Sequence, residues 1–246
     1  MKKRFIRLRD GFLSLPLFDR IFDTAVFIGM IVVTVLQILT KDEPFKVLQL
    51  CLNIAASLTF FLSHLLFSER SLPGSISLRC QKYIDIIVLF GSIGGQYLIL
   101  GDYYSNYDTA THLVTGCVVC LIGVSVFEHY IKEPAFKKPT LCALFSFFMS
   151  MTVSLMWEIF EFVSDFFFGG TCQGYDLPAD SSKFFYFHWF SFAPRPEAQH
   201  GLYDTFADVI AGMLTAALTS FIIAKVLQKK KRKDADLSMR TEYSHA

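Results

Sequence analysis

Six runs of apolar residues, separated by short charged or polar segments, determine what this chain can fold into. A helix needs about 20 apolar residues to cross a hydrocarbon core of about 30 Å. Because 53% of the 246 residues are hydrophobic, a water-soluble domain could not bury all of this apolar surface. The runs predict an all-α, polytopic membrane helix bundle of about six transmembrane helices, at residues 22–40, 45–67, 83–101, 107–130, 140–168 and 203–227.

Positive charge is distributed unevenly among the segments between these runs. Most of the 23 Lys and Arg residues lie in residues 1–21, in the loops after the second and fourth runs, and in the tail. Segments rich in Lys and Arg stay on the cytoplasmic side. We therefore expect both the N- and C-termini of this multi-pass protein to lie in the cytoplasm.

The chain shows no internal repeat and no Gly/Ser/Pro-rich linker, which predicts one integral membrane domain over residues 1–246. Its expected parts are a basic N-terminus (1–21), the six-span bundle (22–227) with a long outer loop (169–202), and a basic tail (228–246). That loop contains FFYFHWFSF (184–192), an aromatic stretch typical of a membrane interface. Whether the loop closes as a lid or only packs on helix ends is left open. The lipid bilayer is the predicted partner, and no nucleic-acid partner is expected.

Seven ionisable residues share helix faces in the last three predicted spans. Their spacings of three, four or seven residues place each group on one side of its helix. The topology brings all three groups to the outer end of the bundle. They are Asp108 and His112 in YDTATHLVTG (107–116), Glu158, Glu161 and Asp165 in WEIFEFVSD (157–165), and Asp204 and Asp208 in YDTFADVIAG (203–212).

Six carboxylates gathered around one His cannot all remain ionised without compensation by protons or by a cation. Oxygen ligands with one imidazole suit a divalent metal, namely Mg²⁺, Mn²⁺, Fe²⁺ or Zn²⁺. All seven residues are predicted metal ligands, and Gln173 and Asp176 are possible additions. Glu158 and Glu161 are also the predicted catalytic residues. Glu158 should be the deepest carboxylate of its helix, with Asp165 as the solvated outer member.

Simpler explanations exist for some of these acids. Carboxylates near helix ends are often hydrated, and Asp108 and Asp204 could interact with the dipole of a helix first turn. Asp23 and Asp85 lie near the starts of their predicted spans, where helix capping is a sufficient interpretation.

The order D-x-x-x-H on one span, W-E-I-x-E-x-x-x-D on the next, and D-T-x-x-D-x-x-x-G on the last resembles the YjdF-like bacterial inner-membrane proteins. The likeness covers about residues 80–225. A more distant similarity is to VanZ-like membrane proteins, which are associated with glycopeptide resistance. The resemblance implies a small polytopic, multi-pass protein of the bacterial cytoplasmic (inner) membrane, and it implies no particular reaction.

Two classes of function fit these observations. The first is an intramembrane metal-dependent enzyme of hydrolase type, which acts on a lipid-linked or cell-envelope substrate with Glu161 as general base. The second is a non-enzyme, either a proton- or cation-coupled carrier or a structural envelope protein, because buried carboxylates also serve as proton relays. The sequence leaves enzyme activity open.

Overall fold

A computed structural model describes residues 2–40, 51–98, 100, 107–168 and 200–244 of the chain. Every regular element within these ranges is a helix, which confirms the predicted all-helical class. The elements are α1 (Lys2–Leu13), α2 (Leu17–Leu39), α4 (Thr59–Leu66), α5 (Leu72–Ser75), η1 (Leu78–Cys80), α6 (Gln81–Val88), η2 (Leu89–Tyr97), α8 (Tyr107–Ile131), η3 (Ala135–Lys137), α9 (Pro139–Phe168) and α11 (His200–Ser244).

Four of these helices are long and apolar enough to cross a membrane: Leu17–Leu39, Tyr107–Ile131, Pro139–Phe167 and Thr205–Met239. Their outward faces carry large apolar side chains that nothing in the described chain covers, such as Val32 on α2, Phe148 on α9 and Leu218 on α11. Contiguous apolar surface of this kind is unfavourable in water and favourable in lipid. The multi-pass helical membrane protein expected from the sequence is therefore supported.

The predicted span 45–67 is not one continuous helix. Residues 51–56 are helical, residues 57–58 form a turn, and α4 follows. In an unbroken helix the N–H of Phe60 would bond to the carbonyl of Ala56. Instead the side-chain amide of Gln81 lies between these two groups. The Phe60 N–H donates to Oε1 of Gln81 (2.9 Å), and Nε2 of Gln81 donates to the carbonyl of Ala56 (3.4 Å). An inserted side chain is an established cause of a helix break.

The predicted span 83–101 is also divided. It begins as α6 and continues as η2, a π-helical segment with the sequence LFGSIGGQY. Neither this segment nor 51–66 is among the four long apolar helices, so membrane crossing at these two places remains a prediction.

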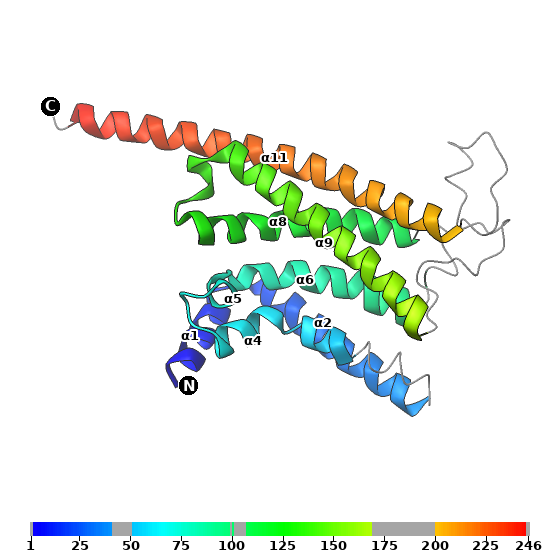
Figure 1. The fold of residues 1–246 in the computed structure, drawn as a ribbon. Helices are drawn as coiled ribbons and strands as arrows, with labels where there is room; N and C mark the ends of the chain where they lie inside the picture. The colour runs from blue at the N-terminus through cyan, green and yellow to red at the C-terminus, as the bar shows by residue number, and fades with distance from the viewer. Residues whose placement is uncertain (1, 41–50, 99, 101–106, 169–199, 245–246) are drawn as a thin grey trace, which may run out of the picture.

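Contacts between distant segments define the course of the chain (Figure 1). Arg4 in α1 donates to the carbonyl of Leu66 at 2.7 Å, so the end of α4 lies beside α1. Tyr107 donates to the carbonyl of Phe90 at 2.8 Å, so η2 approaches the start of α8. Both chain ends lie toward the same end of the bundle, and the start of α11 lies at the other.

Helices α8, α9 and α11 pack against one another as a three-helix unit. Small residues allow the close approach: a Cβ on Gly116 of α8 would lie 2.5 Å from the backbone O of Gly212 on α11, and one on Gly123 would lie 2.9 Å from Cα of Ser146 on α9. Ser150 of α9 also donates to the carbonyl of Gly116 at 2.9 Å. Close backbone approach through small residues is the usual packing mode of membrane helices.

Helix α2 packs on α6 and η2 through a cluster of Val26, Met30, Val33 and Val88. The capping interpretation of Asp23 and Asp85 is wrong. The N-cap residues of α2 and α6 are Pro16 and Cys80, and both carboxyl groups are buried, with exposed fractions of 3% and 0%. Each Asp lies more than one residue inside its helix, on the face that meets the other helix.

We predict that Gly116→Ala destabilises the three-helix unit by about 1–3 kcal/mol, the usual cost of overpacking, because the backbone carbonyl of Gly212 cannot move aside cheaply. Thermal unfolding in detergent measures the change. Gly91→Ala is the matched control, since a Cβ at Gly91 meets no atom of the described residues within 4 Å. Equal melting temperatures for the two variants would contradict the proposed close packing.

Candidate functional site

The start of α8, the end of α9 and the start of α11 lie together at one end of the bundle (Figure 1). His112 of α8 is the centre of the site, and its side chain is 6% exposed. Each of its ring nitrogens faces carboxylates from a neighbouring helix or from its own. The arrangement follows from the helical spacing that the sequence shows.

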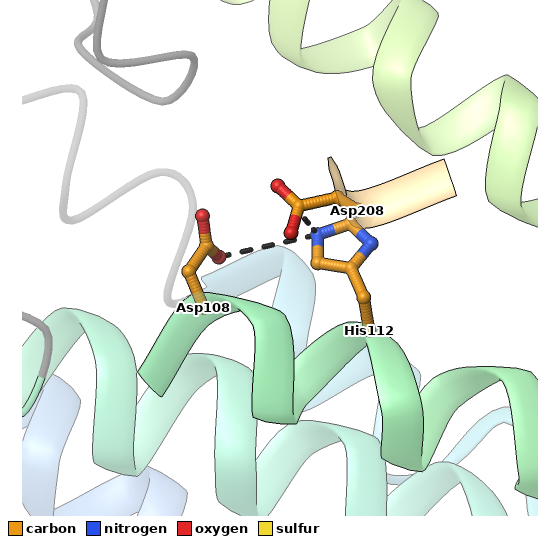
Figure 2. Close-up of side chains that lie close together, drawn as sticks. All are labelled: Asp108, His112 and Asp208. Carbon is orange, nitrogen blue, oxygen red and sulfur yellow. Dashed lines mark ion pairs between the residues drawn. The ribbon is translucent and has the colours of Figure 1, made fainter. Parts of the chain in front are cut away.

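The Nε2 atom of His112 faces two aspartates (Figure 2). Oδ1 of Asp108, one turn earlier on α8, is at 3.9 Å, and Oδ2 of Asp208 on α11 is at 3.8 Å. Asp208 is almost completely buried, whereas the Asp108 side chain is 33% exposed. This side of the ring therefore combines an enclosed carboxylate with a partly accessible one.

The Nδ1 atom of His112 faces α9. Oε1 of Glu158 lies 3.6 Å away, and the Glu158 side chain is 3% exposed. Glu161, one turn further along, is also buried and accepts a hydrogen bond of 2.7 Å from the indole Nε1 of Trp157. The indole thereby fixes one oxygen of the Glu161 carboxylate.

Within the described residues, two groups of side chains are close enough to hold a metal ion: Asp108, His112 and Asp208, and His112, Glu158 and Glu161. In each group the potential ligand atoms all lie within 4.8 Å of one another. A metal held at about 2.0–2.2 Å by N and O ligands separates neighbouring ligand atoms by roughly 3–4 Å. The observed spacings fit such a site after small side-chain movements.

The two groups share one imidazole, which limits how they can be used. A neutral His has one N–H donor and one nitrogen lone pair. The ring can therefore ligate a metal through one nitrogen while the other donates to a carboxylate. That pairing of metal, His and carboxylate is the common arrangement around ligating histidines.

Three buried serines lie on α9 on the N-terminal side of its carboxylates. Ser146, Ser150 and Ser154 precede Glu158 at intervals of four residues, and all three are buried. A Cβ on Gly212 would lie 3.1 Å from the Oγ atom of Ser154, so this face of α9 meets α11 directly. These serines, and Trp157 as a partner of Glu161, were not predicted from the sequence, although both lie at four-residue spacings in it.

Four of the seven predicted ligands, His112, Glu158, Glu161 and Asp208, converge as buried side chains, and Asp108 lies at their partly exposed edge. Asp165 is 3% exposed, so the prediction that it is the solvated carboxylate is wrong. Neither of the two potential metal-binding groups in the described chain includes it. Asp204 lies on α11, but its side chain is outside the described part, as are Gln173, Asp176 and most of the loop 169–202.

Fold and site together define a multi-pass helical membrane protein with a buried carboxylate–histidine cluster. A family model described as "Predicted membrane protein (DUF2238)" matches residues 22–230, and the chain belongs to this family. The resemblance to YjdF-like proteins, which form this family, is thereby confirmed. Neither the curated proteins nor the solved structures gave a match.

We predict that Glu158→Gln folds and, without added metal, melts at the wild-type temperature or above it. The amide keeps the shape and hydrogen-bonding capacity of the side chain but removes one charge from a group of buried carboxylates. For a chain of this size, about 1 kcal/mol raises the melting temperature by about 2–4 °C. Thermal unfolding in chelator-treated detergent samples measures this, and a clearly lowered melting temperature would contradict the electrostatic reasoning.

Proposed function

We propose that the cluster binds a divalent metal ion at Nε2 of His112, with Asp108 and Asp208 as carboxylate ligands. The observation that carries the proposal is the convergence of carboxylates from two helices on one buried imidazole nitrogen (Figure 2). Nδ1–H would then donate to Glu158, which holds the ring in its ligating orientation. Mg²⁺, Mn²⁺, Fe²⁺ and Zn²⁺ all suit these ligands.

The proposed activity is metal-dependent hydrolysis of a lipid-linked or cell-envelope substrate. When bound, the metal would supply a Lewis acid that polarises a substrate oxygen. Glu161 is the proposed general base, because the Trp157 indole orients it. The partly exposed Asp108 edge would admit the reacting group, and the apolar outer surface of the helices would accept a lipid chain.

A proton- or cation-coupled carrier is the second candidate, and a specific observation favours it. The break between residues 56 and 59 and the π-helical segment η2 interrupt two consecutive helical segments. Discontinuous helices are typical of substrate and ion sites in secondary transporters. Stoichiometric metal with hydrolysis would favour the enzyme, whereas pH-dependent flux into liposomes without bound metal would favour the carrier.

We expect Mg²⁺, Mn²⁺ or Zn²⁺ to raise the melting temperature of the wild-type protein, because a ligand that binds only the native state stabilises it by mass action. Asp208→Asn removes a proposed direct ligand and should abolish this effect. Glu158→Gln changes only the group that orients His112, so metal affinity should fall by about 10–100-fold.

The control for these thermal-unfolding measurements is Glu133→Gln, a partly exposed carboxylate outside the site that faces Lys138. It should respond to metal as the wild type does. If no metal stabilises the wild type, or if Asp208→Asn responds like the control, the metal proposal is wrong. Elemental analysis of the purified protein provides an independent measurement.

We also propose the inner membrane as the location, with both chain ends in the cytoplasm and the cluster at the outer ends of α8, α9 and α11. The distribution of Lys and Arg supports this orientation. A reporter fused after Lys229 should therefore be active only if it functions in the cytoplasm. Activity of a periplasm-specific reporter at that position would reverse the orientation and place the cluster on the cytoplasmic side.

A further inference from the structure

A second cluster of buried polar side chains lies where α2 meets α6. Asp23 of α2 is 3% exposed, and Gln81 and Asp85 of α6 are 0% exposed. At its edge, Nζ of Lys82 lies 3.1 Å from Oδ2 of Asp19, so the Lys82 charge is directed to that carboxylate. This cluster shares no residue with the His112 site, and it is independent of the function proposed for that site.

The hydrogen bonds of Gln81 show which oxygen of Asp85 is an acceptor. Because the Phe60 N–H can only donate, the atom that it meets must be Oε1 of Gln81 (2.9 Å). The Nε2 group of Gln81 is therefore the donor to Oδ1 of Asp85, at 3.0 Å. Oδ1 of Asp85 thus accepts a hydrogen bond, and a proton on this carboxyl group would belong on Oδ2.

The carboxyl groups of Asp23 and Asp85 are within hydrogen-bonding reach of each other. In the part of the chain that the structure describes, no donor reaches Oδ2 of Asp85 or either oxygen of Asp23. Ionised carboxylates only accept hydrogen bonds. Two ionised groups here would repel each other at a buried position, whereas one proton between them forms a strong, charge-assisted hydrogen bond.

A proton suits this pair better than a metal ion does. Ca²⁺ and Mg²⁺ take about six or more oxygen ligands. Among the described residues, only three oxygens of the pair lack a donor, two from Asp23 and one from Asp85. The other titratable groups that act on the pair are Asp19 of α2 and Lys82 of α6, which are already joined to each other. In the segment 51–66, the groups that bond to Gln81 are both backbone groups, the N–H of Phe60 and the carbonyl of Ala56.

We propose that Asp23 and Asp85 share a single proton and form a second ionisable site, a proton-binding site between α2 and α6. Gln81 connects this site to the helix break, because the same amide contacts Asp85, Phe60 and Ala56. Loss of the proton adds a second negative charge beside Gln81. Proton binding at the pair therefore controls both the packing of α2 on α6 and the geometry of the break.

Infrared spectroscopy of the full-length protein in liposomes tests the proposal, because a protonated carboxyl group has a C=O stretching band that a carboxylate lacks. We expect this band in the wild type at neutral pH, with a shift in D₂O, and its loss at alkaline pH. Asp85→Asn and Asp23→Asn should each remove the contribution of one carboxylic acid. In either variant the amide NH₂ can donate to the remaining carboxylate, so the helices stay joined without the proton.

The control is Asp10→Asn, an exposed residue paired with Arg9. It should leave the band unchanged. Difference spectra of wild type against each variant separate this pair from the carboxyl groups near His112. The proposal is wrong if neither Asn variant reduces the band at neutral pH. It is also wrong if Na⁺ or K⁺ at constant pH stabilises the wild type against heat but not the Asn variants, because a cation would then occupy the site.

As a second readout, wild-type stability should fall as pH rises from neutral to alkaline, since the folded protein alone holds this proton at neutral pH. Asp85→Asn and Asp23→Asn carry no such proton and should lose less stability over the same range. A steeper loss of stability in these variants than in the wild type would overturn the proposal even if one of them folds poorly.

Discussion

The contact of α8 with α11 at Gly116 and Gly212 sets the distance at which the ionisable groups meet. With backbones this close, His112 and Asp208, each one turn nearer the end of the bundle, must share one small volume. Ser150 and Ser154 hold α9 against the same contact between α8 and α11. Glu158 therefore lies on the other side of the imidazole, near Nδ1. The cluster is thus a consequence of small residues deeper in the bundle.

Helical periodicity made much of this site predictable. The pairs Asp108 and His112, and Glu158 and Glu161, share faces because residues three or four apart on a helix are neighbours. Alternation of span direction then brings the groups to one end, which the packing of α8, α9 and α11 bears out. What periodicity could not provide is the sharing of one imidazole between two carboxylate groups, since that depends on the rotation of each helix about its own axis.

The predictions from the sequence that proved wrong share one physical cause. The burial of Asp165, the pairing of Asp23 with Asp85 and the break after residue 56 all depend on which helix lies opposite, and a single sequence does not state this. Apolar length alone predicted a continuous span at 45–67. The interruption comes from Gln81, a residue 21 positions after Phe60, which replaces a local hydrogen bond by a distant one. Tertiary contact thus overrides a local pattern.

The dependence of the break on a single amide has a consequence for how such a chain can change over generations. If Gln81 were replaced by an aliphatic residue, the Phe60 N–H and the Ala56 C=O would lose the amide to which they now bond. They could then bond to each other and close the helix across the gap. One codon therefore separates an interrupted segment from an uninterrupted one. The same replacement would leave Oδ1 of Asp85 without its donor, so an ancestor or descendant lacking Gln81 should also lack the acid pair. Covariation of Gln81 with Asp23 and Asp85 among relatives would record that link.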